Sequence, residues 1–139
     1  MKITTKGRAA VRILVDLARN KEEYISVSEM SQRQRITPKY LERIISPLVK
    51  ANLVLSMRGV NGGYKLAKAP SEITIKEILD ATGDSIKLSS CVNGEKCPVA
   101  GNCDSIVVWK GLNDLINDFL ENITLEKLII KTYGDKKTR

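Results

Sequence analysis

The sequence predicts a mainly α-helical protein with one small β-hairpin and a long helix near its C-terminal end. Three observations predict this fold class. Apolar residues recur at helical spacing through the first 50 residues, two strand-like runs flank a glycine-rich turn at 58–63, and an apolar seam recurs every three or four residues over 109–123. With 139 residues and 42% hydrophobic content, the chain can bury a core without disulfide bonds.

The first two helices are expected over 7–20 and 28–34. In the first, apolar residues at positions i, i+3, i+4 and i+7 form one face: Val11, Leu14, Val15 and Ala18. Ser28 is a good N-cap for the second helix, in which Met30 would face inward. The residues between these helices form a polar connection.

The third helix is expected to begin at Pro38, with Thr37 as its N-cap, and to run to about residue 50. Pro47 predicts a kink or a late break, because proline lacks a backbone N–H and crowds the preceding turn. Four apolar residues would point to the core: Leu41, Ile44, Ile45 and Leu48. The same spacing leaves Lys39 and Arg43 on the exposed side.

A β-hairpin is expected next, with strands at 53–57 and 64–67. The turn between them contains Asn61 and Gly62, a pair that readily adopts positive φ angles. Three helices followed by a hairpin is the order of a winged helix-turn-helix, whose third helix enters the major groove of DNA. The hairpin, or wing, carries Arg58, a cation suited to a narrow minor groove. The alternative is a plain surface turn beside a solvated basic helix.

Charge is concentrated in the first half of the chain. The net charge is +7, but residues 1–70 hold 14 Lys and Arg against 5 Asp and Glu, a net +9. Residues 71–139 hold 9 against 11, a net −2. This asymmetry predicts a polyanionic partner, and double-stranded DNA fits better than a membrane, because the basic residues do not line one face of one helix. A solvated basic surface with no partner is the alternative.

Composition also excludes several classes of protein. The chain has no histidine, which excludes Ser-His-Asp and Cys-His catalysis and every His-ligated metal site. Aromatic residues make up 4%, too few for the stacking platforms that bind single-stranded nucleic acid. No secretion signal or membrane-spanning run is apparent. We therefore expect a cytoplasmic protein that is not an enzyme and does not bind membranes.

The first half, 1–70, is expected to be a DNA-binding domain, and 71–139 to hold a cysteine loop and dimerisation helices. Thr74 and Glu77 form a capping box for a fourth helix that ends near residue 82. A polar loop then covers 83–103, which is longer than ordinary connections and suggests a function.

A long fifth helix is expected to end near residue 122, with Asp104 or Ser105 as its N-cap. Its apolar residues form a seam with spacings of three and four: Trp109, Leu112, Ile116, Phe119 and Ile123. The rest of the chain has little with which to cover this seam, so we expect a homodimer in which the helix packs on its twofold mate. Packing on its own domain is the alternative. Thr124 can cap a last short helix.

All three cysteines fall in one stretch with the spacing C-x5-C-x5-C: Cys91, Cys97 and Cys103. Three thiolates in a short loop of a cytoplasmic protein suit an iron–sulfur cluster or zinc. Zinc usually takes four Cys or His ligands, which favours the cluster. A regulatory pair of redox thiols and inert cysteines are the alternatives.

Taken together, these residues resemble the IscR/NsrR/CymR-type winged helix-turn-helix regulators, the Rrf-two family. Besides the cysteine loop, four segments match the family pattern: Lys6-Gly7-Arg8, Tyr40-Leu41-Glu42, Arg58-Gly59-Val60-Asn61-Gly62-Gly63-Tyr64 and Asn122-Ile123-Thr124-Leu125. The loop is similar to that of the branch that regulates iron–sulfur cluster assembly. The resemblance implies a dimeric bacterial transcription regulator of cluster-assembly or related sulfur and redox genes.

The resemblance also implies roles for individual residues. The third helix would contact the major groove and the wing the minor groove. This assigns DNA contacts to Thr37, Lys39, Tyr40, Arg43, Arg58, Asn61 and Gly62. Glu42 matches a family glutamate close to the bases, where a carboxylate disfavours some sequences and tolerates others that offer a cytosine amino group.

The implied cofactor is an iron–sulfur cluster on the three cysteines, 2Fe–2S in the first place and 4Fe–4S as the alternative. The family branch has a histidine three residues after the last cysteine, where this chain has Ile106. A fourth ligand would come from elsewhere, and Asp104 is the nearest oxygen ligand. The alternatives are Ser105, Asn102, a solvent molecule, a small thiol and a carboxylate from the partner subunit. Two other functions stay open: a cluster-free, thiol-sensing regulator of cysteine metabolism, and a small iron–sulfur carrier or redox protein. The basic first half argues against the carrier.

Overall fold

The computed structural model describes residues 2–86, 88, 92, 98–99 and 101–130. Its elements are helices α1 (Thr5–Arg19), α2 (Val27–Gln34) and α3 (Pro38–Lys50), strands β1 (Val54–Met57) and β2 (Gly63–Leu66), a single 3-10 turn η1 (Pro70–Glu72), and helices α4 (Ile75–Ala81) and α5 (Ile106–Glu121). A further helical stretch covers 125–130. The expected class, mainly α-helical with one small hairpin, is confirmed.

Side-chain caps decide where α1 and α2 begin. α1 begins earlier than expected, because the Thr4 hydroxyl accepts a hydrogen bond from the N–H of Gly7 at 3.1 Å. The expected Ser28 cap of α2 is wrong. Ser26 takes that position, since its hydroxyl accepts from the N–H of Glu29 at 3.1 Å, and Ser28 lies within the first turn.

Two features of α3 are predicted from the sequence: an N-cap at Thr37 and an effect of Pro47 on the helix. The Thr37 hydroxyl accepts from the N–H of Tyr40 at 3.2 Å, so the predicted cap is confirmed. α3 runs through Pro47 to Lys50, so a break at Pro47 is wrong, whereas the kink given as the other outcome stays a prediction. Pro47 removes only one hydrogen bond, close to the helix end, and the buried face holds the helix in place: Leu41, Ile44, Ile45 and Leu48 are fully buried.

The hairpin is attached to the body of the molecule along β2. β1 and β2 pair antiparallel, and the N–H and C=O of Tyr64 exchange hydrogen bonds with Ile25, both of 2.9 Å. Gly63 permits this approach, because a Cβ there would lie 2.1 Å from the Ile25 carbonyl oxygen. The bridge fixes extended backbone directly before Ser26, which is why α2 begins there.

One hydrophobic core joins the two halves of the chain. The first three helices supply most of its fully buried side chains: Ile13, Leu14, Leu17, Met30, Leu41, Ile44, Ile45 and Leu48. Ile73, Ile78 and Leu125 from the second half belong to the same cluster. The core therefore extends past residue 70, and the boundary between 1–70 and 71–139 stays a prediction.

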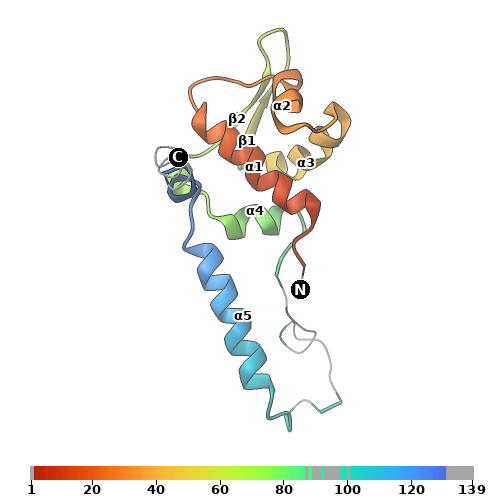
Figure 1. The fold of residues 1–139 in the computed structure, drawn as a ribbon, viewed down its shortest axis with the longest axis vertical. Coiled ribbons are helices and arrows are strands. Elements are labelled where there is room, and N and C mark those ends of the chain that lie inside the picture. The colour runs from red at the N-terminus through yellow and green to blue at the C-terminus, as the bar shows by residue number, and fades with distance from the viewer. Residues whose placement is uncertain (1, 87, 89–91, 93–97, 100, 131–139) are drawn as a thin grey trace, which may run out of the picture.

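α5 leaves this body and extends along the long axis of the molecule, away from the wing (Figure 1). None of its residues is buried. The chain after it returns to the body, where the Ile75 N–H donates to the Ile123 carbonyl at 2.9 Å and the Leu125 N–H donates to the Ile73 carbonyl at 3.0 Å. Within the described ranges, no helix is long and apolar enough to cross a membrane.

Of the predicted N-caps of α4 and α5, the structure confirms the first and contradicts the side-chain cap at Ser105. The capping box of α4 is confirmed by bonds in both directions between Thr74 and Glu77. Ser105 stands at the N-cap position of α5, but its backbone is helical and its side chain makes no capping bond. Its hydroxyl instead lies 3.1 Å from the Cys103 sulfur and accepts from the Trp109 indole N–H at 3.2 Å. The predicted side-chain cap at Ser105 is therefore wrong.

Candidate nucleic-acid interface

The outer side of α3 carries a row of polar side chains. Because the core residues of this helix bury one face, Lys39, Glu42 and Arg43 lie exposed on the other. Thr37 and Tyr40, the other predicted contacts, lie at the start of the helix, where the Thr37 hydroxyl is engaged as the cap. A helix with one face fixed in the core and a charged outer face has the form of a recognition helix.

The remaining predicted contacts lie in the turn of the wing. Arg58 and Asn61 are exposed there, and the N–H of Gly62 donates to the Gly59 carbonyl at 3.0 Å. Gly59 has a φ angle of +116°, and a Cβ at Gly62 would lie 2.2 Å from the Met57 carbonyl oxygen. Glycine at these two positions therefore allows the tight turn that presents Arg58 to solvent.

A cavity of about 560 Å³, which we call the wing hollow, separates α3 from the wing. The start of α2, one residue of α3 and the wing line it: Ser26, Val27, Glu42, Ser56, Met57, Arg58, Gly59, Val60, Gly62, Gly63 and Tyr64. The structure thereby brings Glu42 and Arg58, which are far apart in the sequence, to one cavity. Tyr40 and Arg43 do not line it.

Tyr64 belongs to the wing hollow but was not among the predicted site residues. It is half-buried, and its burial together with the negative charge of Glu42 raises the pKa of its phenol. The phenol therefore keeps its proton at neutral pH and can donate a hydrogen bond. Its position directly after the glycines of the wing is the sequence signal that could have identified Tyr64 as a site residue. The direction of its side chain depends on the pairing with Ile25, which no local pattern specifies.

The cations of this surface have no partner within the part of the chain that the structure describes. Lys39, Arg43 and Arg58 form no ion pair or hydrogen bond there, whereas the ion pairs that do occur belong to Arg33 and Lys76. Unpaired cations on a helix and a neighbouring wing are available to phosphates and base edges.

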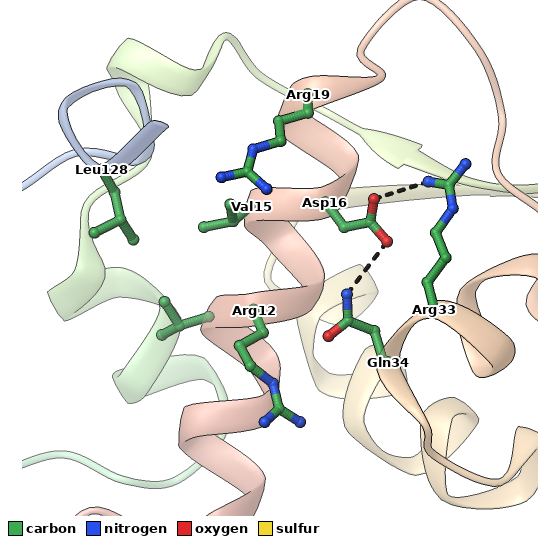
Figure 2. A pocket seen from close by; sticks show the side chains of 8 residues that line it. Arg12, Val15, Asp16, Arg19, Arg33, Gln34 and Leu128 are labelled. Carbon is green, nitrogen blue, oxygen red and sulfur yellow. Dashed lines mark hydrogen bonds and ion pairs between the residues drawn. The ribbon is translucent and has the colours of Figure 1, made fainter. Parts of the chain in front are cut away.

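A second hollow, of about 420 Å³, lies between α1 and α2 (Figure 2). There the Asp16 carboxylate accepts hydrogen bonds from Arg33 at 2.8 Å and from Gln34 at 3.3 Å. These bonds tie the end of α2 to α1 and so help to fix the helix that precedes α3. Arg12 and Arg19 also line this hollow and add to its positive charge.

Most of the predicted metal-binding loop, including Cys91 and Cys97, lies outside the described residues. Among those that are described, no three Cys, Asp or Glu side chains gather as metal ligands would. The hydrogen bond between Cys103 and Ser105 lowers the pKa of the Cys103 thiol. That shift favours the thiolate, which both binds soft metals and reacts with oxidants. Asp104, the predicted fourth ligand, is exposed beside it.

α5 presents its predicted seam largely to solvent. Trp109 is 42% exposed and Phe119 is 64% exposed, Leu112 is also exposed, and Ile116 is half-buried. Ile123, the last residue of the predicted seam, lies beyond the end of α5 at Glu121 and is half-buried. Three further apolar side chains are exposed on this helix: Val107, Val108 and Leu115. The exposed apolar surface of α5 is therefore wider than the seam alone.

Comparison with known proteins identifies the family. The family model for Rrf2, described as an iron-dependent transcriptional regulator, matches residues 3–131. The HTH-type transcriptional regulator IscR of Pectobacterium carotovorum subsp. carotovorum is 38% identical over 130 residues, which cover 93% of this chain and 79% of that protein.

Solved structures agree with this match. CymR, the global cysteine regulator of B. subtilis, is similar with a TM-score of 0.78 and 30% identity, over 94% of this chain and 98% of that one. T. potens IscR is similar with a TM-score of 0.75 and 31% identity, over 95% and 88%. These relatives are DNA-binding transcription regulators rather than enzymes. The chain therefore belongs to the Rrf2 family of winged-helix transcriptional regulators.

Proposed function

We propose that this protein is a homodimeric regulator that binds double-stranded promoter DNA and senses iron–sulfur cluster or redox state through residues 91–103. The observation that carries the proposal is the arrangement of the molecule in Figure 1. The wing lies at one end, the cysteine-bearing start of α5 lies at the other, and α5 connects that start to the body. The regulated genes would be cluster-assembly or related sulfur and redox genes.

DNA would be bound by α3 and the wing. Lys39 and Arg43 would reach phosphates or guanine edges in the major groove, and Arg58 would enter the adjacent minor groove. Four further residues would contact or approach the backbone: Thr37, Tyr40, Asn61 and Gly62. Glu42 would select among base pairs through its negative charge.

Two copies would associate through α5. The exposed apolar surface of this helix is what supports a dimer, because Trp109, Leu112 and Phe119 stay 41–64% exposed within the described part of the same chain. Packing α5 against its twofold mate would also set the distance and angle between the two recognition helices. Binding to a palindromic promoter site depends on that distance.

The three cysteines Cys91, Cys97 and Cys103 would hold the iron–sulfur cluster, of the 2Fe–2S type or alternatively 4Fe–4S. The fraction of protein that carries such a cluster would depend on the supply of iron and sulfide and on oxidants, and the cluster would therefore act as the sensor. Around Cys103, the indole N–H of Trp109 donates to the Ser105 hydroxyl, which leaves the hydroxyl proton able to donate to the sulfur. This order of donors suits a ligating thiolate. Asp104 is the candidate for the fourth ligand.

The described residues on both sides of the loop are tied to the body of the molecule. Upstream of residues 91–103, the Asp84 carboxylate accepts from the Thr4 N–H at 2.9 Å and from the Thr4 hydroxyl at 2.6 Å. The second end of the loop adjoins α5, and the chain after α5 is bonded to the body at Ile75. Ordering of the loop would therefore bias α5 and, through it, the spacing of the two α3 helices.

A thiol-sensing regulator without a cluster is the second candidate. It is favoured by the similarity to CymR, a cysteine regulator by its title, and by the lowered pKa of the Cys103 thiol. In that case oxidants and reductants rather than iron would change DNA affinity.

The test measures iron and acid-labile sulfide per chain, with a visible spectrum, on protein purified without oxygen. Equal iron and sulfide with visible absorbance support the cluster, and the same preparation is then titrated with promoter duplex at rising salt. A DNA-binding protein loses affinity steeply as salt rises. Zinc, or no metal together with intact DNA binding, would move the assignment to a structural metal or to the thiol sensor. Absence of salt-dependent duplex binding would contradict both regulators.

Cys103→Ser and Ser105→Ala serve as a matched pair in this test. We expect Cys103→Ser to lose the cluster because a ligand is removed, and Ser105→Ala to retain it with a shorter lifetime in air. Both variants should keep salt-dependent duplex binding, since both residues directly precede α5, whose start lies at the opposite end of the molecule from the wing (Figure 1). Full cluster content in Cys103→Ser would remove this residue from the ligand set.

A further inference from the structure

The wing hollow contains an acid and a phenol that the proposed function does not connect. Glu42 enters the hollow from α3 and Tyr64 from β2. Glu42 is exposed and forms no hydrogen bond or ion pair with another described residue. An exposed glutamate on a helix samples many rotamers, so it discriminates poorly between base pairs unless another group orients it.

Unlike Glu42, Tyr64 is held in place by backbone hydrogen bonds and by packing of its ring. Its backbone exchanges two hydrogen bonds of 2.9 Å with Ile25, and it stands opposite Ser56 in the hairpin. Its ring packs against the hydrophobic core and is half-buried. Contacts to the α1–α2 connection, the partner strand and the core therefore hold the phenol at one place in the wing hollow.

The two side chains also act on each other. Burial is the first cause of the raised pKa of the Tyr64 phenol, and the negative charge of Glu42 is the second. The two side chains line the same cavity and form no hydrogen bond in this structure. A protonated phenol is a hydrogen-bond donor and a carboxylate is an acceptor, so the pair can form such a bond when the Glu42 side chain turns toward Tyr64. Arg58 lines the same hollow, but an ion pair with Arg58 would cancel the charge of Glu42. A neutral phenol can orient the carboxylate and leave its charge intact.

We propose that Tyr64 is a positioning residue for base specificity: when DNA is bound, its hydroxyl donates a hydrogen bond to the Glu42 carboxylate across the wing hollow and directs that carboxylate toward base edges. There the carboxylate accepts a hydrogen bond from the exocyclic amino group of cytosine and repels the acceptor atoms of guanine. The inference rests on the proposed function, in which α3 lies in the major groove. What the inference adds is the role of Tyr64, which makes the contact between Glu42 and the base edges selective.

The experiment compares Tyr64→Phe with the unchanged full chain on promoter duplexes that differ by one base pair at a time beneath α3. Phenylalanine keeps the ring and its packing and removes only the hydroxyl. We expect the ratio of affinities for cytosine over guanine at the Glu42 position to fall about five- to tenfold, the usual effect of losing one hydrogen bond. The melting temperature should change little.

Two further variants separate positioning from packing. Tyr24→Phe is the matched control, because the Tyr24 ring lies 5.5 Å from the Lys65 ammonium and does not line the wing hollow. It should leave the ratio unchanged. Glu42→Gln should flatten the ratio by itself. In the Glu42→Gln background, adding Tyr64→Phe should change the ratio no further, because the two residues act as one unit.

An unchanged ratio in Tyr64→Phe would overturn the proposal. Equal losses from Tyr64→Phe with and without the Glu42 carboxylate would also overturn it, because the effect would then not pass through Glu42. If the unchanged chain binds no duplex in a salt-dependent manner, the proposed function fails first, and this inference fails with it. Selectivity that depends on Glu42 but not on Tyr64 would leave the proposed function in place and remove only the role of Tyr64.

Discussion

At the residue scale, Gly7 shows how one missing side chain joins α1 to the start of the cysteine loop. A Cβ at Gly7 would lie 2.1 Å from the Asp84 carboxylate oxygen and 3.2 Å from the Leu79 side chain. That same carboxylate oxygen accepts both hydrogen bonds from Thr4, the N-cap of α1. Glycine therefore makes room for the acid that anchors the helix start.

Gly7→Ala should lower the free energy of unfolding by about 1–3 kcal/mol, because the added methyl group displaces Asp84. Urea denaturation measures the change. The same substitution in an Asp84→Ala background should cost clearly less, since the clash is then absent. Equal costs in both backgrounds would show that Asp84 is not the obstacle.

Tyr64 gives a second residue-scale prediction, on alkaline stability. Its folded pKa is raised above the ordinary value of 10.0, so folding binds a proton that the unfolded chain releases. The contribution of this residue is fully present below pH 10 and is lost as the pH rises through the folded pKa. Melting temperatures between pH 8 and 11 should fall more steeply for the unchanged chain than for Tyr64→Phe. Parallel curves would contradict the prediction.

At the element scale, helix starts depend on which of several capping residues the neighbouring structure selects. Ser26 and Ser28 are both acceptable N-caps in the sequence, and both precede the same helix. The bridge between Ile25 and Tyr64 makes the backbone extended up to residue 25, so that Ser26 has the cap conformation. A contact between distant residues thus decides a local feature.

Ser26→Ala should therefore lower the free energy of unfolding by about 1 kcal/mol, because α2 loses its capping hydrogen bond to Glu29. Ser28→Ala is the matched control and should change stability by less than about 0.5 kcal/mol, since alanine is tolerated within a helix. Chemical denaturation of both variants checks the pair. The reverse order of effects would restore Ser28 as the cap.

At the scale of the whole molecule, α5 is the helix that the described part of the chain leaves most exposed. It projects from the body, and no residue along it is buried in the described structure. A wide apolar face exposed to water is unfavourable unless another surface covers it. The proposed dimer removes this surface from water and links the cysteine end of each chain to both recognition helices.

Phe119→Glu should shift the protein from dimer to monomer, because it places a charge in the proposed interface. Light scattering after size-exclusion chromatography measures the mass. Val60→Glu is a matched control, since Val60 is fully exposed in the turn between β1 and β2, and this hairpin points away from α5 (Figure 1). A Phe119→Glu variant that stays dimeric, or an unchanged chain that is monomeric at micromolar concentration, would contradict the α5 dimer.

Several features of this protein follow from the sequence by itself. The order of three helices and a hairpin, the Thr37 cap, the capping box at Thr74 and Glu77 and the long helix α5 all depend on residues close together in the chain. Helical periodicity, capping and turn chemistry are local, so a pattern of a few residues is enough to specify them. The charge difference between the two halves of the chain also follows from the sequence alone, because it is a count of charged residues.

Other features were decided only by the tertiary structure. The choice of Ser26 as cap, the unbroken helix at Pro47 and the place of Tyr64 beside Glu42 each depend on packing between segments distant in the chain. No local pattern encodes such contacts, because the free energy that selects them comes from burial and hydrogen bonding across the fold. The wing hollow exists only once α2, α3 and the hairpin have been brought together, and that is why its phenol could not be assigned from the sequence.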